Sequence, residues 1–160
     1  MNQSASTTLS KQIEGVKVKS LKIIPDNRGK LMEMLRCDDD MFEQFGQVYF
    51  TTAIPGVIKA WHHHKQQADN FICVAGRAKI VLYDAREDSP TFKEINEFYA
   101  SLDEPKLVHI PIGVYHGFKC VSQTECMIIN VITKVYDYKN PDEFRVDAFD
   151  PQVGYDWNKD

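Results

Sequence analysis

Several features that would narrow the function are scarce in this chain of 160 residues. Its four cysteines show neither C-x-x-C spacing nor the pattern of a small disulfide-stapled scaffold, which favours reduced, mostly buried thiols. It has 19 Lys and Arg against 23 Asp and Glu and no basic run, so the electrostatic footprint of a nucleic-acid-binding protein is missing. No stretch approaches membrane-spanning length, and residues 1–15 lack the apolar core of a signal peptide. We therefore predict a cytoplasmic protein with neither nucleic acid nor membrane as a partner.

Helical patterns are also scarce, whereas short apolar or alternating runs punctuated by Gly, Pro, Asn and Asp are frequent. This pattern is typical of an all-β sandwich or barrel. We expect strands over residues 16–24, 30–35, 47–53, 57–62, 70–75, 79–83, 94–99, 107–110, 118–121 and 127–133. One short helix is expected over residues 39–45, where Asp38 or Asp39 could cap it. The length suits a flexible segment at 1–15 and a single domain at 16–160, with a C-terminal arm from about residue 137.

Histidine occurs only five times, but four of these residues follow one pattern. His62, His63 and His64 are consecutive, and His116 ends a Pro-Ile-Gly-Val-Tyr-His run. Because residues i and i+2 of a strand point to the same face, His62 and His64 are expected to share a face while His63 points away. If Gly76 closes the turn after the next strand, Asp69 can come back towards that face, and His116 can reach it from a second, distant strand. The pattern predicts three imidazoles and one carboxylate around a single cavity.

The spacing of these residues forms two ordered motifs. The first is Gly56-x5-His62-x-His64-x4-Asp69-x6-Gly76, and the second is Pro111-x-Gly113-x2-His116. Together they resemble the two sequence motifs of the cupin superfamily, with Asp69 where Glu is usual and Cys120 where Asn is usual. The resemblance implies an all-β double-stranded β-helix, a small jelly roll whose inner face holds the motif residues.

A longer set of short motifs covers most of the chain, from Val16 to Trp157. In order, they are Asp26-Asn-Arg28-Gly29, Glu33, Gln47, Gly56-Val-Ile-Lys59-Ala-Trp-His62, Asp84-Ala-Arg86, Ser89-Pro90-Thr91-Phe92, His116-Gly117-Phe118, Asp150-Pro151 and Asp156-Trp157. This series resembles the dTDP-4-dehydrorhamnose 3,5-epimerase family. The resemblance implies an epimerase or isomerase that acts on a nucleoside-diphosphate 4-keto-6-deoxy sugar by proton abstraction next to the ketone, without a cofactor. It also implies a homodimer whose subunits exchange strands near the site.

The same resemblance implies roles for individual residues. His62 would be the base, and Asp150 would orient its imidazole and stabilise the charged form. Substrate contacts would come from Arg28, Glu33, Gln47, Lys59, His116, Tyr136 and Tyr138. Among these, Arg28 and Lys59 would hold the diphosphate, and a tyrosine could stack on the nucleotide base.

Three positions depart from the epimerase pattern. The second residue after the base usually bears an amide in the family, and here it is His64. The family's lysine near the substrate ketone aligns with Asp69, and no phenol lies between Ile129 and Thr133, where the family's acid tyrosine falls. Without that acid, single epimerisation or 3,4-ketoisomerisation fits better than inversion at two carbons. The run His62-His63-His64-Lys65 also resembles sugar-nucleotide 3,4-ketoisomerases, in which paired histidines act as acid and base. His64 is therefore a second catalytic candidate.

The departures at His64 and Asp69 also restore a complete cupin metal set. The set consists of His62, His64, Asp69 and His116, and three histidines with one carboxylate suit a divalent transition metal such as Fe(II), Mn(II), Ni(II) or Zn(II). Two alternatives to the epimerase or isomerase therefore remain open. One is a metal-dependent cupin enzyme of different chemistry, and the other is a non-catalytic cupin that binds a sugar nucleotide.

Overall fold

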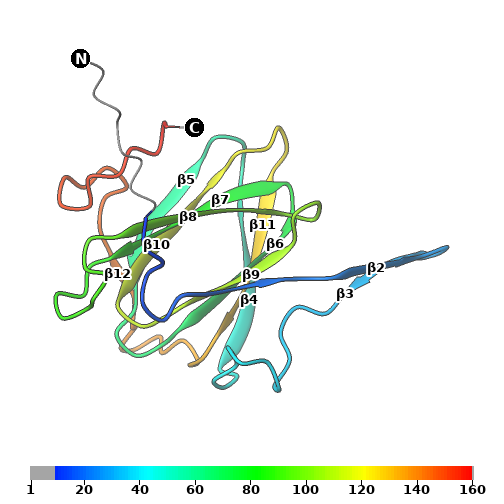
Figure 1. Ribbon diagram of the computed structural model, residues 1–160, viewed down its shortest axis with the longest axis horizontal. Coiled ribbons are helices and arrows are strands. Elements are labelled where there is room, and N and C mark those ends of the chain that lie inside the picture. Colours follow the sequence, from blue (N-terminus) through cyan, green and yellow to red (C-terminus); the bar gives the residue numbers. More distant parts are fainter. Residues whose placement is uncertain (1–9, 160) are drawn as a thin grey trace, which may run out of the picture.

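Two five-stranded antiparallel sheets pack face to face in this protein (Figure 1). A computed structural model describes residues 10–159. The first sheet has the order β1-β9-β6-β11-β4 and the second the order β12-β5-β10-β7-β8, while β2 and β3 form a separate hairpin. The strands are β1 (Lys17–Ser20), β2 (Ile23–Asp26), β3 (Gly29–Met32), β4 (Gln47–Ala53), β5 (Ile58–His63), β6 (Asp69–Ala75), β7 (Arg77–Asp84), β8 (Ile95–Ser101), β9 (Lys106–Ile110), β10 (Val114–Cys120), β11 (Cys126–Ile132) and β12 (Phe144–Arg145). The predicted all-β jelly roll is confirmed.

Side-chain alternation explains why these segments form half-buried strands. Along β11 every second residue is buried, from Cys126 to Ile132, because successive side chains of a strand point to opposite faces. The central core lies between the sheets and includes Phe71, Ile80 and Val108. Burial of each such side chain contributes about 1.5–3 kcal/mol to the free energy of folding. One end of the space between the sheets stays open and forms the cavity described below.

The C-terminal segment covers the outer face of the second sheet. There Trp61 of β5 packs on Trp157 with ring centroids 5.0 Å apart, and Tyr155 contacts both rings. The indole nitrogen of Trp61 donates a hydrogen bond to the carbonyl of Ala148 at 3.1 Å. These contacts attach the chain beyond β11 to the outside of β5, and so place residues 142–145 beside the histidines.

The predicted helix over residues 39–45 is wrong. The structure has turns there, and no helix occurs between residues 10 and 159. The carboxylate of Asp39 accepts hydrogen bonds from the Arg36 backbone N–H at 2.9 Å and from Lys19, and the Phe42 N–H bonds to the Asp39 carbonyl. Such local side-chain bonds compete with helix formation. The same range accordingly holds no helix that could cross a membrane.

Other differences from the predicted elements are local. The strand expected over residues 16–24 is broken at Leu21, which is buried in a separate cluster with Met41 and Ile72. The predicted flexible segment at 1–15 lies largely outside the described residues, but Ile13 is buried and its N–H donates to Asn96 at 2.8 Å. Of the cysteines, Cys37 is exposed and the other three are buried.

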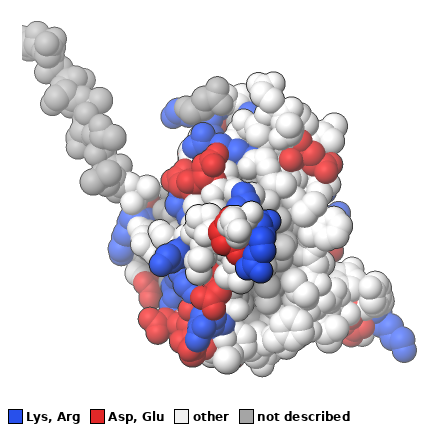
Figure 2. Space-filling model, turned by 90° about the vertical axis from the view of Figure 1, so that its right-hand side faces the viewer, with Lys and Arg blue, Asp and Glu red and all other residues white. Residues whose placement is uncertain are grey.

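The β2–β3 hairpin extends away from the body of the molecule (Figure 1). Ile24 and Leu31 of this hairpin are 47% and 57% exposed, and on the edge strand β4 Val48 and Phe50 are 52% and 65% exposed. Figure 2 shows the face toward which the hairpin extends: charged side chains gather on one side of it, and the other side is largely free of them. Exposed apolar side chains grouped on an edge strand and a hairpin are typical of an interaction surface.

Candidate active site

A cavity of about 720 Å³ opens between the two sheets. Eight of the residues predicted for the site line it: Gln47, Lys59, His62, His64, Asp69, His116, Tyr136 and Tyr138. His63 lies on the opposite face of β5, as the alternation predicts, and its ring stacks on Tyr115 with centroids 4.3 Å apart. Three predicted residues are not among those that line the cavity, namely Arg28, Glu33 and Asp150.

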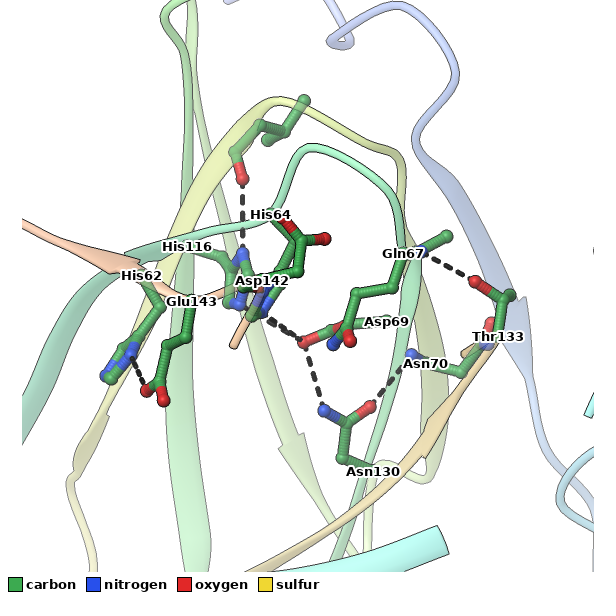
Figure 3. A network of polar contacts seen from close by, with 12 residues as sticks. His62, His64, Gln67, Asp69, Asn70, His116, Asn130, Thr133, Asp142 and Glu143 are labelled. Carbon is green, nitrogen blue, oxygen red and sulfur yellow. Dashed lines mark hydrogen bonds and ion pairs between the residues drawn. The ribbon is translucent and has the colours of Figure 1, made fainter. Parts of the chain in front are cut away.

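His62 faces the cavity and has a carboxylate partner from the C-terminal segment. Its Nδ1 lies 3.3 Å from Oε1 of Glu143 (Figure 3). The Glu143 carboxylate also accepts hydrogen bonds from Arg145 at 2.5 and 2.8 Å. Burial, together with the charges of His116 and Arg145, lowers the pKa of His62 to about 4, although Glu143 opposes this shift. At neutral pH the imidazole is therefore uncharged and able to accept a proton.

This pairing corrects the predicted role of Asp150. The carboxylate next to His62 belongs to Glu143, whereas Oδ1 of Asp150 accepts a hydrogen bond from the Gln152 backbone N–H at 2.8 Å. An Asp before a proline commonly begins a turn, and Asp150 does so here. The neighbouring Asp147 carbonyl and Val153 N–H complete that turn through hydrogen bonds to the Asp150 backbone.

Asp69 is the buried centre of the cavity. Its side chain is 2% exposed, and its Oδ2 lies 3.2 Å from Nε2 of His116 and 3.5 Å from Nε2 of His64 (Figure 3). Gln67 and Asn130 donate further hydrogen bonds to this carboxylate, both at 3.0 Å. Burial alone would raise the pKa of Asp69, but the hydrogen bonds from the two imidazoles outweigh it and hold the pKa well below its usual range. Asp69 is therefore ionised.

The two imidazoles beside Asp69 are held by backbone carbonyls through their other nitrogens. His116 Nδ1 lies 3.1 Å from the Val114 carbonyl, and His64 Nδ1 hydrogen bonds to the Asp142 carbonyl. Since a carbonyl only accepts, each Nδ1 carries a proton and each Nε2 faces Asp69. Burial lowers the pKa of His64, but the Asp69 carboxylate more than compensates, so the net shift is upward.

One short segment, residues 142–145, contacts all three consecutive histidines. Asp142 bonds to His64 through its carbonyl, Glu143 pairs with His62, and the Phe144 ring stacks on His63 with centroids 5.1 Å apart. The Asp142 carboxylate also accepts hydrogen bonds from two backbone N–H groups of the turn that follows β5, at 2.9 and 2.7 Å. This segment thus fixes the orientation of the histidine triplet.

The other predicted residues lie toward the open side of the cavity. Lys59 Nζ donates to the Thr51 hydroxyl at 3.0 Å, and the Gln47 side-chain oxygen accepts the Tyr136 backbone N–H at 2.9 Å. Tyr136 and Tyr138 meet edge to face with centroids 5.0 Å apart. A lysine and a pair of tyrosines, of which Tyr138 is exposed, suit an anionic ligand that carries a ring.

Comparison with known proteins identifies the family. Residues 10–160 match the family model of dTDP-4-dehydrorhamnose 3,5-epimerase. The chain is 42% identical over 146 residues to the spore coat polysaccharide biosynthesis protein SpsL of Bacillus subtilis, covering 91% of this chain and 97% of that protein. It belongs to the dTDP-4-dehydrorhamnose 3,5-epimerase family. The chain is also 39% identical over 148 residues to the probable low-salt glycan biosynthesis epimerase Agl13 of Haloferax volcanii, covering 91% of this chain and 95% of that protein.

Solved structures of this epimerase family share the fold. A dTDP sugar isomerase from Desulfovibrio desulfuricans superposes with a TM-score of 0.87 at 30% identity, over 92% of this chain and 94% of that chain. The epimerase RmlC from Legionella pneumophila, solved in complex with dTDP-4-keto-L-rhamnose, superposes with a TM-score of 0.81 at 28% identity, over 93% of this chain and 81% of that one. The protein is thus an enzyme of the sugar-nucleotide epimerase type.

Some residues at or behind the cavity wall were not predicted from the sequence or from the family resemblance. Glu143 and Arg145 come from the irregular C-terminal segment, where no periodicity indicates which side chains turn inward. Tyr49 had a usable signal, because it lies two residues from Gln47 on β4 and so shares its face. Behind the cavity wall, Asn130 of β11 falls within the range where the family's acid tyrosine is expected; it is fully buried and is not among the lining residues.

Proposed function

We propose that the protein epimerises a dTDP-linked 4-keto-6-deoxy sugar, with His62 as the base that removes the proton next to the C4 ketone. The observation that carries this proposal is the neutral imidazole of His62 in the cavity, paired through Nδ1 with Glu143. Its other nitrogen, Nε2, is the proton acceptor, and Glu143 stabilises the imidazolium that forms. Membership of the epimerase family supports the reaction type. The proposed chemistry needs no cofactor.

The substrate's charge and ring are matched by the residues around the cavity mouth. Lys59 and Arg145 line the cavity and supply two cations for the diphosphate. Tyr136 and Tyr138 supply aromatic faces on which the nucleotide base stacks. Asp69 stands where the family has its lysine, and the imidazolium that this carboxylate favours at His64 provides positive charge in its place.

The pH profile follows from the environment of His62. Because the pKa of His62 is lowered to about 4, the imidazole stays neutral well below pH 6.5. We expect kcat/KM to fall on acidification only as the pH drops through about 4, since protonation removes the base. Quenched assays between pH 3.5 and 8, corrected for loss of folded protein, measure how kcat/KM falls on the acid side of the pH profile. An acid limb centred near the ordinary histidine pKa of about 6.5 would contradict the assignment.

We propose that the protein is a homodimer whose β2–β3 hairpin reaches the cavity of the other subunit. The Arg28 side chain at the hairpin tip is 84% exposed and pairs only with Asp26 among the described residues, while Glu33 is exposed and pairs with Arg36. Neither is among the residues that line the cavity of its own chain. The exposed apolar residues of the hairpin and β4 support pairing of two copies along this side.

Mixing two inactive variants tests whether the site is shared. We expect Arg28→Ala and His62→Ala each to lose activity, and an equal mixture after subunit exchange to regain about a quarter of wild-type activity, because one of four sites then holds both residues. Activity is measured below KM, and sedimentation gives the oligomeric state. Each variant carried alone through the same mixing procedure serves as the control. No recovery from a mixture that forms dimers would place both residues in one subunit.

Turnover of a panel of nucleotide 4-keto sugars tests the proposed function. NMR of the products from dTDP- and UDP-linked substrates shows whether a carbon next to the ketone inverts, or whether the ketone moves to C3. Inversion supports the epimerase, whereas movement of the ketone would favour a 3,4-ketoisomerase that uses His62 and His64. Binding without turnover would favour a non-catalytic sugar-nucleotide-binding cupin. The predicted cytoplasmic location is tested separately, by cell fractionation.

A metal-dependent enzyme is the second candidate, and one observation favours it. The ligand atoms of His64, Asp69 and His116 all lie within 4.8 Å of one another, and both histidines present Nε2 while Nδ1 is held by a carbonyl, as in many metal sites. His62, the fourth predicted ligand, is not part of this group. A divalent metal held there would polarise a substrate oxygen. Stoichiometric metal in untagged protein that is lost in His64→Ala would support this candidate, and full activity of metal-free protein would exclude it.

A further inference from the structure

Asn130 lies opposite a phenol on the neighbouring strand. It pairs in register with Tyr49 across β11 and β4, and its Nδ2 lies 2.8 Å from the Tyr49 hydroxyl. The family pattern places an acid tyrosine within residues 129–133 of β11, where this chain has none. A phenol therefore reaches this part of the cavity from the adjacent strand.

The direction of the hydrogen bond between these side chains is fixed by the backbone. The Asn70 N–H donates to Oδ1 of Asn130 at 3.0 Å, so that oxygen is the acceptor and Nδ2 is the donor. Nδ2 then donates to the Tyr49 hydroxyl and also to Asp69 Oδ2 at 3.0 Å. The phenol oxygen accepts, and within residues 10–159 no hydrogen bond uses its own proton. That proton is free to be donated to a ligand.

Tyr49 and His62 face the same cavity from opposite sheets. Tyr49 is on β4 of the first sheet and His62 is on β5 of the second, and both line the cavity. Epimerisation requires a proton to leave one face of the sugar ring and another to arrive at the opposite face. Groups on two facing walls meet this requirement, whereas two groups on one strand do not.

We propose that Tyr49, held by Asn130, is the general acid that returns a proton to the face of the enolate opposite His62; this inference rests on the proposed function. His62 Nε2 takes the proton from the carbon next to the ketone, and the electron pair forms the enolate. The Tyr49 O–H bond then breaks as the new C–H bond forms on that carbon, leaving a phenolate that Asn130 stabilises. Water returns a proton to the phenolate and takes one from the imidazolium, so protons balance.

The surroundings of Tyr49 suit this role. Burial and the charge of Asp69 raise the pKa of Tyr49 to about 12, so the phenol keeps its proton until the enolate accepts it. The other two tyrosines of the cavity wall, Tyr136 and Tyr138, lie beyond β11 in the segment at the cavity mouth, and Tyr138 is 87% exposed. Tyr49 alone of the three has its hydroxyl bonded to a buried side chain among the described contacts.

The Tyr49→Phe variant separates proton removal from proton return. We expect formation of the inverted product to fall about 10²-fold or more, while deuterium from the solvent still enters recovered, non-inverted sugar through His62. The matched control is Tyr99→Phe, on β8 and outside the cavity wall, which should behave as wild type. Melting temperatures check that each variant is folded; Tyr49 is 40% exposed, so loss of one hydroxyl should leave stability close to that of wild type.

Three results would overturn the inference. Inversion by Tyr49→Phe at the wild-type rate would show that another group donates the proton. Loss of exchange together with inversion in the folded variant would make Tyr49 a binding or positioning residue. If wild-type protein neither inverts nor exchanges any nucleotide 4-keto sugar, the proposed function itself is wrong. This outcome differs from the other two because the wild-type protein, and not only the Tyr49→Phe variant, shows no reaction.

Discussion

The His62→Ala variant is expected to lose about 10²- to 10⁴-fold in kcat/KM toward a dTDP-linked 4-keto-6-deoxy sugar, the usual contribution of a positioned general base. The physical reason is that no other neutral imidazole in the cavity has a free nitrogen. His64 and His116 use Nδ1 for backbone carbonyls and direct Nε2 at Asp69. Steady-state assays of the purified variants measure the loss.

The neighbouring histidine provides a matched control for His62→Ala. His63 lies on the outer face between Tyr115 and Phe144, and His63→Phe keeps an aromatic ring in that stack. We expect this variant to retain near wild-type kcat/KM and to keep residues 142–145 in place. If His62→Ala stays within about tenfold of wild type, or if His63→Phe is equally inactive, His62 is not the base.

The Asp69→Ala variant is expected to lose about 3–5 kcal/mol of unfolding free energy. Asp69 is buried and accepts hydrogen bonds or ion pairs from four side chains, so its removal leaves buried donors without a partner. For a chain of this length, the melting temperature should fall by roughly 6–20 °C. Urea denaturation followed by circular dichroism measures the free energy directly.

An exposed carboxylate serves as the control for Asp69→Ala. Asp38 also accepts hydrogen bonds, both from Arg36 at 2.8 Å, but its side chain is 64% exposed, so water replaces them. We expect Asp38→Ala to melt close to wild type. Equal melting temperatures for Asp69→Ala and wild type would show that the buried network around Asp69 does not stabilise the fold.

The strands and the histidine cluster were predictable because both depend on short-range alternation. His62 and His64 lie on the cavity side of β5 and His63 on the other, as the i, i+2 rule requires. The strand at 47–53 was predicted with its observed bounds. The same rule applied to Gln47 would also have placed Tyr49 on the cavity wall.

The carboxylate partner of His62 was not predictable from local pattern. Glu143 lies in a segment without regular alternation, and its position depends on packing of Phe144 on His63 and of Trp157 on Trp61. These are contacts between residues far apart in the sequence, so neither composition nor local spacing indicates them. The family resemblance pointed instead to Asp150, which begins a turn here.

The hairpin shows a second limit of sequence reasoning. Motifs can assign Arg28 and Glu33 to a substrate site, but they cannot tell whether the site belongs to the same chain. In the structure the hairpin extends away from the body of its own chain (Figure 1), and this arrangement singles out Arg28 and Glu33 as residues that could serve a partner's cavity.

Solvent deuterium exchange tests the central claim most directly. Wild-type protein and His62→Ala are incubated in D₂O with a dTDP-linked 4-keto-6-deoxyhexose, and each carbon is examined by NMR. The account predicts that wild-type protein places deuterium on a carbon next to the ketone, with inverted configuration in the product, and that His62→Ala does neither. Exchange that is equally fast in both proteins would contradict it.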